Sequence, residues 1–240
     1  MLYLGDTARV PYGIKSRETI TRYALESSLF LLNNNVKLIV VACNTVSAVA
    51  LPYLRDILKA PIIGVLEPGV QAAISGVNSN SFGIIATPST IESNAYQNRI
   101  KELRENCLVY SQACPLLVPM AEEGITEGEI AEKVLNSYLK IFDDTTIKSL
   151  ILGCTHYPLF KGTISRLLGE GITLVDSAET VAMEVEAMLL RESLIKTHGN
   201  GKVKCFITDV PRNFNEKAER FFGSNLIEVS RKNIFELNVD

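Results

Sequence analysis

The sequence predicts an α/β protein made of two doubly wound lobes of parallel sheet, related by pseudo-symmetry, with a cleft between them. Apolar segments of strand length alternate with segments of helical periodicity, which is typical of parallel sheets covered by helices. Two of the most apolar segments, residues 38–42 and 149–153, each end at a cysteine that helix-capping or helix-starting residues follow. This repeated arrangement indicates two similar halves, each contributing one thiol.

Composition sets the class of protein. The 240 residues can bury one large core or two small ones, and 47% of them are hydrophobic. The net charge of −3 and the lack of a basic run argue against nucleic acid or an anionic membrane as partner. No apolar segment reaches the roughly 18–20 residues that span a bilayer, and the start has no signal-peptide pattern. Five widely spaced cysteines indicate reduced thiols, so we expect a cytoplasmic protein.

The predicted first lobe comprises residues 1–67 and 177–240. Ser16 caps a helix that runs to about Asn33, and Pro52 breaks the helix after Cys43 into two pieces. Further strands are expected at residues 1–4, 62–66, 203–208 and 226–229, with a helix at about 212–222. The loop Gly5–Gly13 follows a strand and therefore lies at the carboxyl edge of the sheet, where open α/β sheets bind ligands.

The second lobe is expected to comprise residues 68–176, after a crossing at Glu67-Pro68-Gly69. Its strands are predicted at residues 81–86, 108–110, 149–153 and 171–175. Thr126 and Glu129 have capping-box spacing at the start of a helix that runs to about Phe142, after an irregular segment between Cys114 and Gly124. Asp176 with Glu179 can cap a helix that ends near Arg191.

The two strand-end cysteines, Cys43 and Cys154, carry the chemistry. They could be metal ligands, structural thiols or catalytic thiols. A closed zinc site usually shows paired ligands at short spacing, and only Cys154 and His156 are close here. Two thiols that face each other across a planar carbanion could remove a proton from one face of a carbon and return one to the other. The adjoining helix N-termini favour the thiolate that such a reaction needs.

At these residues the chain resembles the glutamate racemases of the cofactor-independent aspartate/glutamate racemase superfamily. The matching stretches are Gly5–Gly13, Ala42–Thr45, Gly64–Gly69 and Leu152–Leu159, and the similarity continues in order over essentially the whole chain. The resemblance implies interconversion of L- and D-glutamate for peptidoglycan synthesis, with no cofactor and no metal, in a protein that could form a homodimer. Aspartate racemases tend to carry Glu where this chain has His156, which favours glutamate as substrate.

The resemblance also assigns roles to residues. Cys43 and Cys154 would be the proton-transfer thiols, with His156 assisting Cys154. The substrate would be lined by Tyr12, Gly13, Asn44, Thr45, Thr155 and His156, and Thr87 would join them. Asp6 and Glu122 match acidic positions near the site of the family.

One departure from the family concerns the start of the chain. Family members begin with a strand that ends in Asp-Ser-Gly, followed by a helix, ahead of the strand that is Met1–Leu4 here. In the family, those Asp and Ser side chains bind the substrate amino group, and the Asp supports the first thiol. We therefore expect residues 1–240 alone to be a poor catalyst with an incomplete first lobe. The competing hypotheses are an amino-acid-binding or regulatory protein on the same fold, and a metal-dependent enzyme that uses Cys43, Cys154 and His156.

Overall fold

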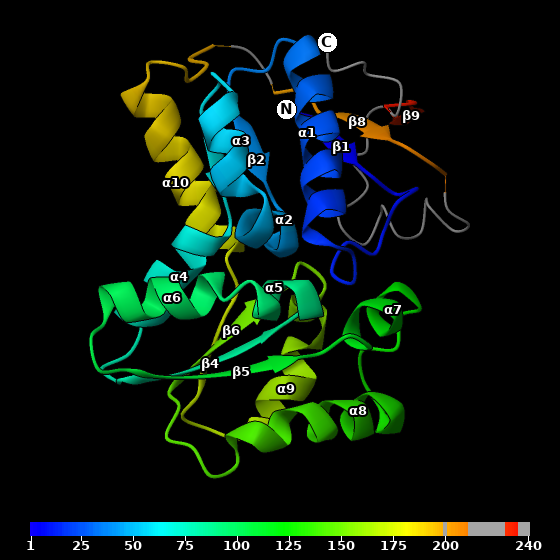
Figure 1. Cartoon of the computed structure of the whole chain (residues 1–240). Coiled ribbons are helices and arrows are strands. Elements are labelled where there is room, and N and C mark those ends of the chain that lie inside the picture. Colours follow the sequence, from blue (N-terminus) through cyan, green and yellow to red (C-terminus); the bar gives the residue numbers. More distant parts are fainter. Residues whose placement is uncertain (199–200, 211–228, 235–240) are drawn as a thin grey trace.

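The computed structural model describes residues 1–198, 201–210 and 229–234. They form two lobes of parallel sheet covered by helices, which confirms the predicted fold class (Figure 1). The helix predicted at 212–222 and most of the strand predicted at 226–229 lie outside the described residues. Within the described part, no helix combines the length and apolar character needed to cross a membrane.

The second lobe is built on one four-stranded parallel sheet. Its strands are β4 (Ser81–Ala86), β5 (Leu108–Ala113), β6 (Ser149–Gly153) and β7 (Thr173–Val175), in the order β5-β4-β6-β7. Ala86 is the register partner of Gly153, so β4 and β6 end side by side. The next residue on each strand, Thr87 and Cys154, therefore emerges at the same carboxyl edge.

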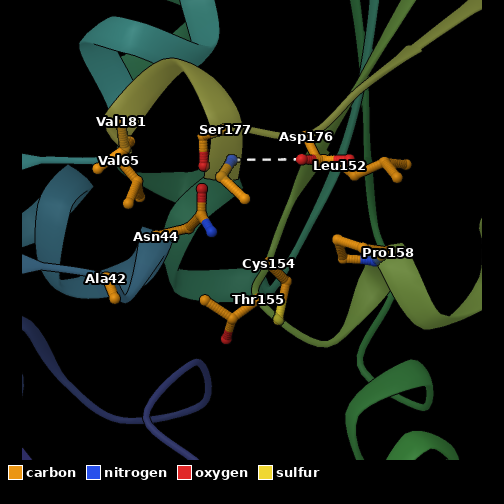
Figure 2. Close-up of a pocket in the computed structure, with 11 residues that line it drawn as sticks. Ala42, Asn44, Val65, Leu152, Cys154, Thr155, Pro158, Asp176, Ser177 and Val181 are labelled. Atoms are coloured by element: carbon orange, nitrogen blue, oxygen red, sulfur yellow. Dashed lines mark hydrogen bonds between the residues drawn. The ribbon is translucent and has the colours of Figure 1, made fainter. Parts of the chain in front are cut away.

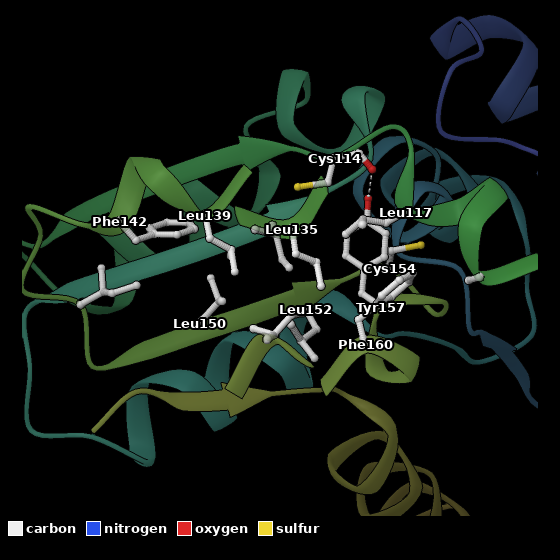
Figure 3. Packing of buried hydrophobic residues seen from close by; sticks show 14 residues of the cluster. Cys114, Leu117, Leu135, Leu139, Phe142, Leu150, Leu152, Cys154, Tyr157 and Phe160 are labelled. Atoms are coloured by element: carbon white, nitrogen blue, oxygen red, sulfur yellow. Dashed lines mark hydrogen bonds between the residues drawn. The ribbon is translucent and has the colours of Figure 1, made fainter. Parts of the chain in front are cut away.

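Helices cover both faces of this sheet. Ile84 points to the face covered by α4 (Leu66–Ser75) and α6 (Ala95–Leu103), whereas its neighbour Ile85 points to the opposite face. That opposite face packs against α8 (Glu129–Leu139) and α9 (Lys161–Leu168), and Figure 3 shows its buried side chains. This cluster includes Cys154 and the fully buried Tyr157, so one catalytic candidate is anchored directly in the core.

The described strands of the first lobe form two separate sheets. β1 (Leu2–Gly5) pairs in parallel with β8 (Lys204–Ile207), which also pairs with β9 (Val229–Arg231). β2 (Ile39–Val41) pairs with β3 (Ile62–Gly64). The helices of this lobe are α1 (Arg17–Asn33), α2 (Asn44–Val49), α3 (Leu51–Ile57) and α10 (Ala178–Arg191). A core of residues from α1, α2, α3, β2 and β3 lies beneath Cys43.

Several local predictions agree with the structure. Ser16 Oγ accepts a hydrogen bond from Thr19 N at 3.3 Å, as expected of an N-cap. The helix after Cys43 is interrupted at Ala50, and Pro52 lies in the first turn of α3, where its missing N–H costs nothing. Asp176 Oδ1 accepts from Ala178 N at 3.2 Å at the start of α10.

Other local predictions were wrong. The capping box at Thr126 does not form, because Gly128, at a φ of +84°, turns the chain so that α8 begins only at Glu129. The Thr126 carbonyl instead accepts from Thr163 Oγ1 at 3.0 Å. The segment after Cys114, expected to be irregular, contains the helix α7 (Leu117–Glu122). Short 3-10 helices follow α8 (Lys140–Phe142) and precede α9 (Tyr157–Phe160).

Candidate active site

Cys43 is the N-cap residue of α2 and lies two residues after the end of β2. The free backbone N–H groups of Thr45 and Val46 and the Thr45 hydroxyl donate to its sulfur. These donors favour the thiolate, but burial raises the pKa of Cys43 by more than they lower it. The donors around Cys43 therefore stabilise its thiolate, but the raised pKa keeps the side chain mainly in the thiol form.

Cys154 occupies the equivalent place in the second lobe, after the end of β6, and is 7% exposed. The backbone N–H groups of His156 and Tyr157 and the Thr155 hydroxyl donate to its sulfur. Burial, together with a smaller contribution from a charge on Cys43, nevertheless raises the pKa of Cys154 to about 12. The expectation that helix N-termini make these thiols acidic was wrong in net effect, because lost hydration outweighs the donors.

Asn44, the neighbour of Cys43, lines the same cavity as Cys154, so the two thiols lie near each other, and a charge on Cys43 raises the pKa of Cys154. They come from different lobes, because Cys43 follows β2 and Cys154 follows β6. Two groups that interact in this way cannot both ionise easily. The arrangement favours one thiolate and one thiol over two thiolates, which is the state that a two-thiol proton transfer requires.

His156 lies between Cys154 and an acidic side chain. His156 Nδ1 is 3.8 Å from Cys154 Sγ, and His156 Nε2 is 2.7 Å from Glu122 Oε1. Glu122 is the last residue of α7, so the segment thought irregular is the helix that delivers it. The structure therefore brings three predicted residues into one contiguous chain of contacts.

A ring of buried hydroxyls joins the two lobes beside Cys43. Thr45 Oγ1 lies 2.9 Å from Thr87 Oγ1, and Thr90 Oγ1 lies 2.9 Å from Thr87 Oγ1 and 3.2 Å from Thr45 Oγ1. All three side chains are at most 5% exposed. Thr45 belongs to α2, and the other two belong to the turn between β4 and α5 (Pro88–Glu92) and to α5 itself.

The loop after β1 is also attached to the second lobe. The Gly13 carbonyl accepts from Ser89 N at 3.0 Å and from Ser89 Oγ at 2.9 Å. A Cβ on Gly13 would lie 2.3 Å from Thr87 Cβ, so only glycine permits this close approach. Tyr12 is half-buried beside Cys43, and burial together with its hydrogen bond to Asp6 raises the pKa of Tyr12 far above its usual range.

Asp6 serves this loop rather than an open site. Its Oδ2 accepts from Arg9 Nε at 2.6 Å and from the Tyr12 hydroxyl, and its Oδ1 accepts from Thr208 Oγ1 at 2.9 Å. Arg9 also pairs with Glu26 of α1. Asp6 therefore holds Tyr12 and the loop in place, which gives it a local structural function.

A cavity of about 260 Å³ lies between the lobes (Figure 2). Of the predicted site residues, Asn44, Cys154 and Thr155 line it, and Ala42 of the Cys43 motif does so too. The remaining wall consists of Val65, Leu152, Pro158, Asp176, Ser177, Ala178 and Val181. Val65 and Ser177 stand where the chain crosses between the lobes, so the cavity is bounded by both crossings.

Metal-ligating side chains do not gather in the part of the chain that the structure describes. No group of three or more His, Cys, Asp or Glu residues there could hold a metal ion. The geometry therefore gives no support to the metal-dependent hypothesis.

Comparison with known proteins places this site in a family. Residues 2–185 match the model of the family described as Asp/Glu/Hydantoin racemase. The chain belongs to the Asp/Glu/hydantoin racemase family. It is 45% identical to a glutamate racemase of Geobacter metallireducens over 229 residues, which cover 95% of this chain and 85% of that protein. It is 46% identical to the glutamate racemase of Aquifex pyrophilus over 223 residues, covering 93% and 84%.

A solved structure of the family extends the comparison to three dimensions. The crystal structure of Francisella tularensis glutamate racemase in complex with D-glutamate matches this racemase-family fold with a TM-score of 0.91 and 39% identity. The match covers 98% of this chain and 88% of that one. The likeness confirms the family resemblance and the two-lobed architecture.

Sequence reasoning about this family member missed three residues of the site. Ser89, Thr90 and Tyr96 were not singled out as site residues. Tyr96 is 1% exposed, and its hydroxyl donates to Asn44 Oδ1 at 2.5 Å. These residues act across the lobe boundary, at 45 to 76 positions from their partners, so local patterns carry no sign of them.

Proposed function

We propose that this chain is a glutamate racemase that interconverts L- and D-glutamate and supplies D-glutamate for peptidoglycan. The observation that carries the proposal is the pair of thiols, one from each lobe, in electrostatic reach of each other at the carboxyl edges of their sheets. The sequence identity to proteins named glutamate racemase supports glutamate as the substrate. The family resemblance further suggests a cytoplasmic location, and a homodimer is one assembly it allows.

The proposed reaction needs only proton transfers. One thiolate removes the α-proton, and the electron pair of the broken C–H bond stays on the substrate as a carbanion conjugated with the carboxylate. The opposite thiol then delivers its proton to the other face, which inverts the stereocentre and leaves the two sulfurs with exchanged protonation states. In the reverse direction the two cysteines exchange roles.

The resting thiols fit this scheme once their surroundings are considered. Both pKa values are raised by burial, so the thiolate forms at a cost that the N–H and hydroxyl donors around each sulfur reduce. His156 lies within reach of Cys154, so we assign it to assist that thiol, with Glu122 behind it. Such general acid–base catalysis typically contributes roughly 10²–10⁴ in rate.

Substrate binding is assigned to the polar groups that surround the thiols. Asn44, Thr45 and Thr155 follow the cysteines within two residues, Tyr12 and Gly13 close the site from the first lobe, and Thr87 closes it from the second. We further propose lobe boundaries at residues 1–67 with 177–240 and at 68–176. Val65 and Ser177, next to these boundaries, line the cavity, so lobe movement would change its size.

A regulatory or purely amino-acid-binding protein on the same fold is the less favoured alternative, since the similarity to glutamate racemases extends over most of the chain. The deciding experiment follows the optical activity of L- and of D-glutamate by circular dichroism, with protein dialysed against a chelator. We expect both solutions to converge on the racemate. Strict dependence on added metal or pyridoxal phosphate would contradict the proposed mechanism, and binding of glutamate without turnover would favour the alternative.

A further inference from the structure

A buried hydrogen bond crosses the lobe boundary next to both thiols. It runs from the Tyr96 hydroxyl of α6 to Asn44 Oδ1 of α2, at 2.5 Å. Tyr96 is 1% exposed and Asn44 is 4% exposed, so neither group can exchange this partner for bulk water. Burial and, to a smaller extent, charges on Cys154 and Cys43 raise the pKa of Tyr96.

The direction of this bond fixes the Asn44 amide. Burial raises the pKa of Tyr96, so its hydroxyl keeps its proton and donates it. The amide oxygen is the acceptor that satisfies this proton, so the NH₂ group is turned to the other side of the side chain. Asn44 lines the cavity between the lobes, and Figure 2 shows its side chain reaching into that cavity from α2. An amide NH₂ facing this space can donate to a carboxylate.

We propose that Tyr96 is a positioning residue of the racemase site, which holds the Asn44 amide with its N–H groups toward a carboxylate of the substrate. The inference rests on the proposed function and adds a specific role to it. Without the tyrosine hydroxyl, the amide could rotate by half a turn and present its oxygen to the carboxylate, which would be repulsive. The second lobe thus orients a binding group of the first lobe.

The test is Tyr96→Phe, which removes one oxygen and keeps the ring in the core. Loss of one hydrogen bond that holds a binding group should raise KM for both enantiomers about 3- to 10-fold. We expect kcat to change less than twofold, because Tyr96 touches neither thiol. The effect should be equal for L- and D-glutamate, since their kcat/KM values are tied by an equilibrium constant of one.

A double-mutant cycle separates positioning from general stability. In an Asn44→Ala background, Tyr96→Phe should have no further effect on KM, because the group it orients is gone. The matched control is Tyr138→Phe in α8, which removes a hydroxyl that accepts a hydrogen bond from Leu116 N and should leave both constants unchanged. An unchanged KM in Tyr96→Phe, or its full effect in the Asn44→Ala background, would overturn the inference.

Asn44→Asp provides a second test that does not depend on how Tyr96→Phe folds. The aspartate keeps an acceptor for Tyr96 and replaces the NH₂ group by an oxygen. We expect KM to rise by at least as much as in Tyr96→Phe, whereas an unchanged KM would show that the NH₂ group does not face the substrate. Wild-type racemisation is measured in the same series. If the wild-type protein does not racemise glutamate, the proposed function fails and the inference fails with it. If it does, the KM values of the variants alone decide the inference.

Discussion

His156 joins Cys154 to Glu122, with Nε2 2.7 Å from Glu122 Oε1 and Nδ1 3.8 Å from Cys154 Sγ. A neutral imidazole that donates its Nε2–H to the carboxylate has its lone pair on Nδ1, directed at the thiol. It can then accept the thiol proton and leave an imidazolium that Glu122 stabilises. Cys43 has no such histidine among the described residues, so the two halves of the site are chemically unequal.

This inequality predicts a directional effect of His156→Gln. We expect kcat to fall by roughly 100-fold in the direction in which Cys154 is the base, and by much less in the other direction. The kcat/KM values of the two directions remain equal, so the KM in the direction with the larger loss of kcat must fall with it. The measurement is initial-rate kinetics from each enantiomer, and Glu122→Gln should give a smaller effect of the same direction. Equal losses of kcat in both directions would remove the assigned role of His156.

Cys43→Ala and Cys154→Ala should each abolish racemisation, because each face of the α-carbon needs its own acid or base. In deuterated water, the wild-type enzyme should introduce deuterium mainly into the enantiomer that forms by inversion, as followed by proton NMR. Cys107→Ala is a suitable control, since this free thiol belongs to the second-lobe core away from both strand ends. A single-cysteine variant with a rate close to wild type would contradict the two-base mechanism.

The sequence was sufficient to predict the positions of the two thiols but not their environment. A strand followed by cysteine and helix-starting residues is a local pattern, and it placed Cys43 and Cys154 correctly at the ends of β2 and β6. Partners such as Tyr96 and Thr90 depend on how two lobes meet, which local patterns do not encode. The net rise of both thiol pKa values was not predicted for the same reason, because it depends on the burial that both lobes create.

Gly13→Ala should disrupt the contact between the lobes. The added Cβ would lie 2.3 Å from Thr87 Cβ and 2.6 Å from its Oγ1, so the loop or the threonine must move. We expect a loss of about 1–3 kcal/mol in unfolding free energy and a large loss of activity. Gly162→Ala is the matched control, since a Cβ there meets nothing within 4 Å. Chemical denaturation and racemase assays of both variants test this, and wild-type behaviour of Gly13→Ala would contradict the close approach.

Alkaline pH should destabilise the fold through Cys154. Its pKa is about 12 in the folded protein and near 9 as the reference value, so the unfolded chain loses this proton first as pH rises. The stability that the buried thiol contributes is therefore complete below pH 9 and decreases from there toward pH 12. Cys154→Ala should flatten this decline, by at most about 1.4 kcal/mol per pH unit. Denaturation curves between pH 8 and 10.5 measure the difference, and parallel curves for both proteins would rule out this linkage.

The last prediction concerns the unequal support of the two thiols by their sheets. β6, which leads to Cys154, has a partner strand on each side. In the described residues β2, which leads to Cys43, pairs only with β3, and Val40 is 40% exposed. A strand with an unpaired side opens locally at lower free energy than a central strand.

Backbone amides of residues 39–41 and 62–64 should therefore exchange with deuterated water at least about tenfold faster than those of residues 82–86 and 149–153, which corresponds to roughly 1.4 kcal/mol. Peptide-resolved mass spectrometry measures both sets in one sample, and α8 serves as an internal reference for the second lobe. Equal protection of the two strand pairs would show that the first lobe is as stable as the second. Faster exchange in β2 would link directly to catalysis, because each local opening displaces Cys43 from its N-cap position.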